Sequence, residues 1–180
     1  MTSEHGRFES AVLPHLDAAF NLARWLTGDD GQARDAVQTG ALRALNYIDN
    51  LRGEEGRSWF LAIVRNVCMD ALRDRAARAS DLDVVEWAEG PAGLEQLSEP
   101  ASRPDELMER RATRERVNAT LRSLPVVYRE ALVLREIEDM GYEEIAIVTG
   151  VPIGTVMSRL SRARRHFRAA FLAQEEGRAV

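Results

Sequence analysis

The sequence has 180 residues, of which 45% are hydrophobic and 29% are charged, and its formal net charge is −5. Such values suit an ordinary soluble protein with one medium domain or two small helical ones. No apolar run approaches the ~18 residues that a membrane span needs, and the polar, acidic N-terminus does not resemble a signal peptide. The sequence therefore predicts a cytoplasmic protein without membrane insertion.

The common signatures of catalysis and of metal binding are missing from the sequence. The three histidines, His5, His15 and His166, are scattered, and the single cysteine, Cys68, allows no intrachain disulfide. There is no G-x-S-x-G, no Gly-rich phosphate loop and no H-E-x-x-H. We therefore expect no cofactor, no bound metal and no enzymatic activity of its own.

Residues 9–78 form a first block with helical periodicity. A helix is expected up to Leu26, with Pro14 at its start or at a kink. Asp29 with Gln32 three residues later predicts the start of a second helix, as a variant of the capping box. One face of that helix is expected to carry Ala33, Val37, Ala41, Leu45 and Ile48.

A Gly- and Glu-rich loop, residues 50–57, precedes a third expected helix that mixes apolar and basic residues. Its apolar side carries Trp59, Phe60, Ile63, Val64, Val67 and Ala71, and Cys68 is assigned to packing. Arginines that track phosphates beside a ring that stacks on bases suit single-stranded DNA, and Asn66 suits a hydrogen bond to an extruded base. For Trp59 the alternative is a core position beside Phe60 and Ile63.

Charge changes sign between the next two segments. Residues 79–106 contain eight acids and one base, Arg103, whereas residues 151–171 contain five arginines and no acid. The Gly- and Pro-containing part of the acidic segment, residues 79–103, predicts an extended or disordered linker. Because the local sign of charge decides where a phosphate backbone docks, the negative net charge does not exclude nucleic-acid binding.

A second helical block begins at Pro104, which like Pro125 suits the first turn of a helix. The helix after Pro125 is expected to end at Gly141. A short helix over residues 142–149, a turn and a long basic helix over residues 153–172 follow. Two helices joined by a glycine-containing turn, the second of them basic, are typical of a helix-turn-helix.

The last helix divides into two faces. An inward face is predicted for Val156, Leu160, Ala163 and Phe167. Because the N-terminal part of a recognition helix usually reaches base edges, the base-side candidates are Ser158, Ser161 and Arg162. The phosphate candidates are Arg159, Arg164 and Arg165. The alternative is a solvated basic face on a packing helix, but the short helix and turn before it favour DNA binding.

Three stretches resemble the extracytoplasmic-function (ECF) group of bacterial sigma factors. The group's polymerase-docking helix is similar to GDDGQARDAVQTGALRAL in this sequence. Its promoter-melting and minus-ten-reading segment is similar to NLRGEEGRSWFLAIVRNVCMDALRDRAAR. Similar to its minus-thirty-five-reading domain is LPVVYREALVLREIEDMGYEEIAIVTGVPIGTVMSRLSRARRHF. The resemblance implies an all-α fold with sigma domain 2 over residues 1–78, an acidic flexible linker over 79–103, and sigma domain 4 over 104–180.

The resemblance implies that the chain carries core RNA polymerase to promoters, with phosphotransfer left to the polymerase. Docking on the clamp helices of the largest polymerase subunit would use Asp35, Gln38, Leu42 and Arg43. Melting and reading of the minus-ten DNA would use the loop 50–57 and Arg57, Trp59, Arg65, Asn66, Asp70 and Arg73. Reading of the minus-thirty-five DNA would use Thr155, Ser158, Arg159, Ser161, Arg162 and Arg165.

The resemblance implies further partners, and the sequence departs from the family pattern at several positions. Contact with the polymerase flap and retention by an anti-sigma factor are both implied. In the docking helix Thr39 replaces the usual acid, Gly40 lies mid-helix and Ala41 replaces the usual aromatic residue, which predicts altered docking. Met157 stands where a basic residue is frequent, which predicts the loss of one phosphate contact.

Two other functions compete with this interpretation. A stand-alone helix-turn-helix regulator of duplex DNA explains the second block but not the Asn66 helix or the acidic linker. The second alternative is a helical interaction protein without a DNA role, such as a decoy for a sigma inhibitor. It predicts that substitution of Arg162 is tolerated.

Overall fold

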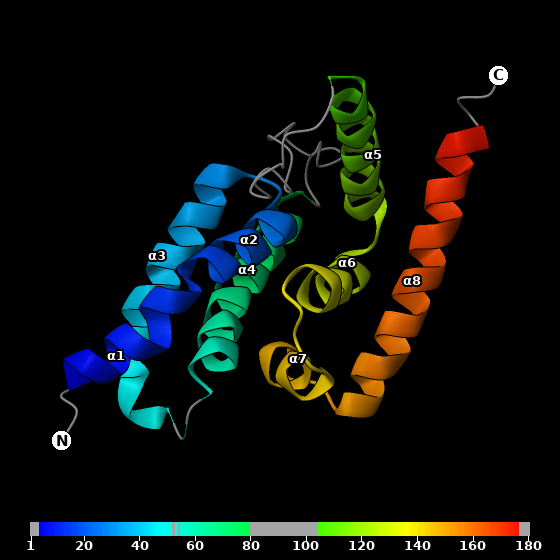
Figure 1. Cartoon of the computed structure of the whole chain (residues 1–180). Helices are drawn as coiled ribbons and strands as arrows, with labels where there is room; N and C mark the ends of the chain where they lie inside the picture. Colours follow the sequence, from blue (N-terminus) through cyan, green and yellow to red (C-terminus); the bar gives the residue numbers. More distant parts are fainter. Residues whose placement is uncertain (1–3, 52, 54, 80–103, 177–180) are drawn as a thin grey trace.

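The computed structural model describes residues 4–51, 53, 55–79 and 104–176, and every secondary-structure element in these ranges is a helix (Figure 1). The N-terminal block consists of α1 (Glu4–Val12), η1 (Leu13–His15), α2 (Leu16–Thr27), α3 (Asp30–Tyr47), η2 (Ile48–Asn50) and α4 (Gly56–Ala79). The C-terminal block consists of α5 (Pro104–Ser123), α6 (Val126–Leu132), η3 (Val133–Ile137), α7 (Tyr142–Thr149) and α8 (Ile153–Glu176). Residues 80–103, most of the predicted linker, lie outside the described residues.

The turn between α2 and α3 follows the expected capping pattern in part. Gly28 ends α2 with a φ of 74°, and its N–H donates to the carbonyl of Arg24 at 2.8 Å. Asp29 caps α3 by accepting the Gln32 N–H at 2.8 Å, so the predicted helix start is confirmed. The Gln32 side-chain oxygen accepts instead from Arg75 of α4. The Asp29 cap therefore fixes the start of α3, and the Gln32 side chain connects α3 to α4.

The buried face of α3 is rotated from the predicted one. Its buried residues are small, namely Ala33, Ala36, Gly40 and Ala44, whereas Leu45, expected inside, is 44% exposed. A Cβ on Gly40 would lie 2.6 Å from Cγ2 of Val64 in α4. The two helices thus approach each other across glycine and alanine, and the larger apolar side chains of α3 remain at the surface.

α4 is buried on two sides, and this explains why its core residues differ from the expected set. Leu61 and Cys68 are fully buried together with Phe60 and Val64, while Ala71, expected inside, is exposed. One side of α4 packs on α2 and α3, and another side packs on α7. The assignment of Cys68 to packing is confirmed, since its side chain is fully buried and free of any disulfide.

The C-terminal block matches the expected helices apart from two boundaries. The helix that starts at Val126 continues as a π-helical turn and ends at Ile137, before the expected stop at Gly141. Gly141 instead begins α7, where its N–H donates to the Glu144 carboxylate at 2.7 Å. The α7 range is the predicted one, and α8 runs one turn further than expected.

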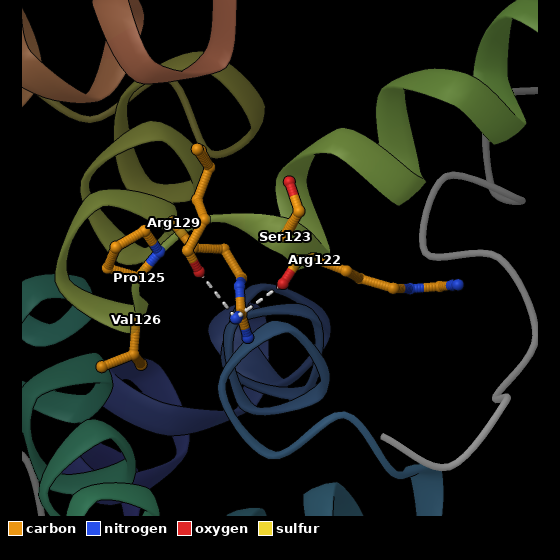
Figure 2. A pocket seen from close by; sticks show the side chains of 6 residues that line it. Arg122, Ser123, Pro125, Val126 and Arg129 are labelled. Atoms are coloured by element: carbon orange, nitrogen blue, oxygen red, sulfur yellow. Dashed lines mark hydrogen bonds between the residues drawn. The ribbon is translucent and has the colours of Figure 1, made fainter. Parts of the chain in front are cut away.

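A buried arginine fixes the connection between α5 and α6. The Arg129 guanidinium donates to the carbonyls of Leu121, Arg122 and Leu124 at 2.9–3.1 Å, and so caps the C-terminal end of α5. Figure 2 shows Arg129 beside Arg122 at this connection. Arg129 also donates to the carbonyl of Trp25 in α2 at 2.9 Å. Burial and the nearby Arg122 lower the pKa of Arg129 to about 10. Arg129 therefore links the two blocks through backbone oxygens.

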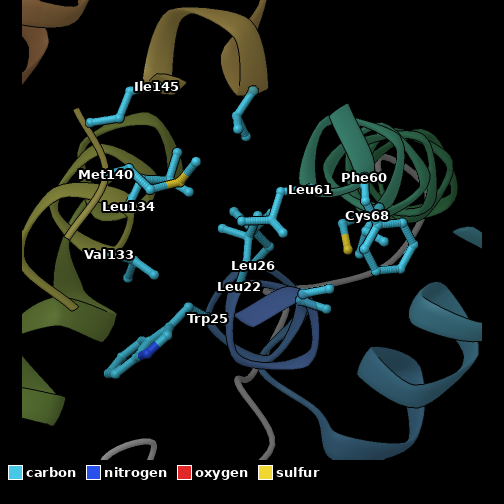
Figure 3. Packing of buried hydrophobic residues seen from close by; sticks show 14 of the residues in the cluster. Leu22, Trp25, Leu26, Phe60, Leu61, Cys68, Val133, Leu134, Met140 and Ile145 are labelled. Atoms are coloured by element: carbon cyan, nitrogen blue, oxygen red, sulfur yellow. The ribbon is translucent and has the colours of Figure 1, made fainter. Parts of the chain in front are cut away.

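The two blocks share one hydrophobic core in this arrangement. Figure 3 shows Leu22, Leu26 and Leu61 of the N-terminal block facing Leu134 and Met140 of the C-terminal block. Contacts join α4 to α7 and α2 to α6. We call this packing of the two blocks against each other the closed arrangement. No described helix is long and apolar enough to cross a membrane.

Candidate nucleic-acid interface

α7 and α8 form the predicted helix-turn-helix. Gly150 ends α7 with a φ of 69°, the left-handed conformation that glycine adopts without strain, and α8 starts three residues later. The predicted inward residues of α8 pack as expected, with Val156, Leu160 and Ala163 at 1% exposure or less and Phe167 partly buried. The packing of this motif leaves the opposite face of α8 open.

The opposite face of α8 carries most of the predicted DNA-reading residues. Exposed on it are Ser158, Ser161, Arg162 and Arg165, whereas Thr155 and Arg159 are half-buried. Ser158 Oγ donates to the carbonyl of Thr155 at 3.0 Å, so its proton is used within the helix. The structure thus gathers four of the six candidates on one accessible surface.

Arg164 has a different position from the other candidate phosphate contacts. Its guanidinium donates to Glu136 at 2.8 Å and 3.1 Å, which holds α8 against the end of η3. The hydrogen bond to Glu136 raises the pKa of Arg164. Both side chains of this ion pair are 51% exposed, so a phosphate contact by Arg164 stays a prediction.

The middle of α4 presents three predicted minus-ten residues to solvent. Asn66, Asp70 and Arg73 are all exposed. Asp70 accepts from Arg73 at 2.6 Å, and its other oxygen lies 3.8 Å from Arg43 of α3. Trp59 is half-buried and packs against the core, which agrees with the packing alternative for this residue.

Arg57 and Arg65, the other two minus-ten candidates, are engaged by the C-terminal block. Arg65 forms a two-point ion pair with Glu130 at 2.7 Å and 3.3 Å, in which the Glu130 side chain is 1% exposed. Arg57 donates to the Glu138 carbonyl at 2.7 Å and lies 3.3 Å from its carboxylate, which also accepts from Asn21 at 2.6 Å. The closed arrangement therefore covers both arginines with acidic side chains.

The acidic partners of these arginines were not found from the sequence. Glu130 and Glu138 are 65 and 81 residues away from Arg65 and Arg57. A local pattern carries no signal for such a pair. The sequence offers a signal for Glu130, which lies beside the apolar run 131–134, where a buried charge needs a partner. Glu138 lies in the mostly charged stretch 135–139, which gives no such signal.

The candidate docking residues lie on the open side of α3. Exposed there are Asp35, Gln38, Leu42 and Arg43, with Leu42 at 59%. α3 also exposes Leu45 and Tyr47, and exposed apolar side chains that gather within a polar rim mark contact surfaces between proteins. Within the described residues no group of three His, Cys, Asp or Glu side chains is placed to hold a metal ion.

Comparison with known proteins identifies both helical blocks. The model for sigma-70 region 2 matches residues 11–78, and the model for sigma-70 region 4 matches residues 114–167. The RNA polymerase sigma-H factor of Pseudomonas aeruginosa is 33% identical over 162 residues, which cover 87% of this chain and 82% of the relative. The chain belongs to the ECF group of RNA polymerase sigma factors.

Further relatives agree with this family. The ECF RNA polymerase sigma-E factor of Escherichia coli is 36% identical over 139 residues, covering 74% of this sigma factor and 71% of the relative. The sigma factor RpoE of Bartonella quintana, solved with the anti-sigma factor NepR, superposes with a TM-score of 0.72 at 25% identity over 91% of this chain and 95% of its own. CnrH, solved with the cytosolic domain of CnrY, gives a TM-score of 0.62 at 25% identity, over 92% and 88%.

Membership in this family fixes the function in outline. The chain is a sigma factor for transcription initiation, and the family is not enzymatic. Region 2 extends from the end of α1 through α4, and region 4 extends from the second half of α5 through most of α8 and includes the helix-turn-helix.

Proposed function

We propose that this sigma factor binds core RNA polymerase through α3 and reads promoter DNA through α4 and α8. The observation that carries the proposal is the exposure of three separate candidate surfaces on the two matched regions. Leu42 is the apolar centre of the first, Asn66 lies on the second and Arg162 on the third. One molecule then positions the polymerase over two promoter elements at once.

The exposed face of α8 reads the minus-thirty-five element. Ser161 and Arg162 face base edges in the major groove, where arginine forks onto guanine, while Arg159 and Arg165 contact phosphates. Thr155 and Ser158 lie at the N-terminal end of α8, nearest the base edges in such a docking geometry.

The surface of α4 captures the minus-ten strand as it unpairs. Each captured base gains ~1–3 kcal/mol from stacking. Extrusion costs a few kcal/mol, so polymerase contacts add the remainder. In this proposal Asn66 hydrogen-bonds a flipped base, Asp70 and Arg73 contact its neighbours, Trp59 lines the site, and Arg57 and Arg65 bind phosphates.

This role requires the closed arrangement to open. Arg57 and Arg65 are already paired with the carboxylates of Glu138 and Glu130. A guanidinium paired with a carboxylate has fewer N–H groups left for a phosphate, and the negative charge of the carboxylate repels the phosphate. We infer that the blocks separate when the sigma factor joins polymerase.

The remaining partners follow from the same family. α3 docks on the clamp helices of the largest polymerase subunit through Asp35, Gln38, Leu42 and Arg43, and the C-terminal block contacts the flap. An anti-sigma factor holds the free chain, as NepR and CnrY bind the two similar sigma factors. We assign the domains to residues 1–78 and 104–180 with a linker over 79–103, and the protein to the cytoplasm, where polymerase works.

Run-off transcription with core polymerase tests the proposal. The sigma factor plus core enzyme should start transcripts at specific genomic promoters, and neither component should do so alone. A chain that binds duplex DNA tightly without polymerase and gives no transcript would favour a stand-alone regulator instead.

A matched pair of variants tests the docking surface. Leu42→Ala changes the candidate docking face, and Leu13→Ala changes a residue that is also exposed but lies on η1. Only the first should lose binding to the core enzyme.

A further inference from the structure

Met157 is an apolar side chain on the exposed, basic side of the recognition helix. It is 54% exposed, although its neighbour Val156 is 1% exposed and packs in the core. An exposed methionine is unremarkable by itself, but this one lies in the first turns of α8, the part of such a helix that reaches base edges. Its environment decides what it contacts.

The side chains next to Met157 leave room for a base pair. Gly154, three residues earlier on the same side of α8, has no atom within 4 Å of the position of a Cβ. Ser161, one turn later, is short and exposed. On the other side, Ile153, four residues earlier, is also apolar and 42% exposed. The surface beside Met157 is therefore shallow, and its longest apolar side chain is that of Met157.

The surrounding charge favours DNA over an apolar protein surface as the partner. Residues 151–171 contain five arginines and no acid, and Arg162 and Arg165 are exposed on this same helix. The major groove offers one apolar group, the C5-methyl of thymine, and small or flexible apolar side chains read it.

We propose that Met157 is a specificity-determining residue that contacts a thymine C5-methyl in the minus-thirty-five element. The inference rests on the proposed docking of α8 in the major groove. The sequence alone predicts only that Met157 loses a phosphate contact. In this proposal Met157 also gains an apolar contact with a base. Burial of one methyl group corresponds to roughly fourfold in affinity.

The test uses holoenzyme, formed from the sigma factor and core polymerase, with a promoter whose upstream element has been selected from random duplexes. Each thymine of the selected element is replaced in turn by deoxyuridine, which removes only the methyl group. At one position the unaltered holoenzyme should lose about fourfold in affinity. Holoenzyme with Met157→Ala should bind thymine and deoxyuridine duplexes equally at that position.

Two further variants sharpen this test. Leu172→Ala removes another exposed apolar side chain, 49% exposed, from the far end of the same helix and should keep the preference for thymine. Met157→Arg should shift the selected base at the same position toward guanine.

The failures of the two proposals are distinguishable. A holoenzyme that selects an upstream element but shows no thymine whose methyl group depends on Met157 would overturn this inference alone. Equal loss from the methyl deletion in the Met157→Ala holoenzyme would do the same. A holoenzyme that selects no upstream sequence would overturn the proposed role of α8 together with this inference.

Discussion

Asp70 connects two candidate surfaces of the N-terminal block at the level of single side chains. It pairs with Arg73 at 2.6 Å on α4 and lies 3.8 Å from Arg43, a candidate docking residue on α3. The three side chains are 48–74% exposed, and exposed ion pairs contribute little to stability. Releasing Arg43 to polymerase or Arg73 to DNA therefore costs the fold almost nothing.

Asn66→Ala should impair open-complex formation more than polymerase binding. Asn66 is exposed on α4, and its side-chain oxygen accepts only a long contact from Arg65 at 3.5 Å, so its removal should leave the fold intact. Loss of a hydrogen bond to an extruded base should reduce permanganate reactivity of the melted thymines at saturating core enzyme. Asp74→Ala, exposed on the same helix, is the matched control. Unchanged footprints with Asn66→Ala would remove Asn66 from the melting role.

Arg162→Ala should lose ~1–3 kcal/mol at one upstream base position and little at the others. Arg162 is exposed on the predicted base-reading side of α8. Competition binding of holoenzyme to a selected promoter and its single-base variants measures this. Arg168→Ala, which removes an exposed arginine further along the helix, should not change the base preference. If Arg162→Ala weakens all sequences equally, Arg162 contacts phosphate.

At the crossing of α3 and α4, the candidate docking helix α3 buries small side chains. Small side chains let the two helices approach, so the larger ones, Leu42 and Leu45, stay at the surface for a partner. In this helix Gly40 faces Val64 of α4. Its role is packing within the N-terminal block.

Gly40→Ala should destabilise the protein despite the better helix propensity of alanine. The added methyl group would lie 2.6 Å from Val64 Cγ2. Overpacking of this kind costs ~1–3 kcal/mol, whereas alanine in a helix gains ~1 kcal/mol over glycine. We expect a net loss of up to ~2 kcal/mol of unfolding free energy, measured by chemical denaturation.

Two controls separate crowding from other effects of the substitution. Gly154→Ala, where a Cβ meets open space, should leave stability equal or higher. In a Val64→Ala background, which removes the crowding atom, Gly40→Ala should no longer destabilise. Equal destabilisation in both backgrounds would show that the helix crossing is not the cause.

The accuracy of sequence-based prediction varied with how local the deciding interactions are. The α7 boundaries were predicted because glycines at both ends set them through the local backbone. The buried face of α3 was not predicted, because hydrophobic periodicity favours Leu45 over Gly40 as a core residue. Leucine also occurs on docking surfaces, so its presence does not mark the buried face. The exposed side of α8 was predicted, since its inward residues repeat with helical spacing.

At the scale of the whole molecule, the closed arrangement could not be predicted from the sequence. It depends on pairs such as Arg65 with Glu130, 65 residues apart, and on Arg129 reaching the Trp25 carbonyl. From the sequence, Arg65 is predicted to contact DNA, and no role is predicted for Glu130 or Arg129. In the closed arrangement, Arg57 and Arg65, which are proposed to bind the melted promoter, instead form contacts between the two blocks.

Cys68 offers a built-in reporter of the contact between the blocks. Burial raises the pKa of its thiol to about 12, and the negative charge of Glu130 adds to this effect. Because only the thiolate reacts, alkylation of Cys68 should be very slow in the closed arrangement. Any change that removes the Glu130 charge or separates the blocks should lower this pKa and speed the reaction.

Glu130→Gln should therefore accelerate alkylation of Cys68 at a fixed pH below 9, followed by mass spectrometry of the peptide that contains Cys68. The substitution keeps the shape of the side chain, removes the charge next to the thiol and leaves Arg65 without its counter-charge, which weakens the closed arrangement. Core polymerase added to the unaltered protein should accelerate the same reaction, because docking opens the contact. Glu136→Gln, which breaks only the exposed pair with Arg164, should leave the rate unchanged. An unaltered rate in Glu130→Gln and with polymerase would show that the blocks do not separate at this contact.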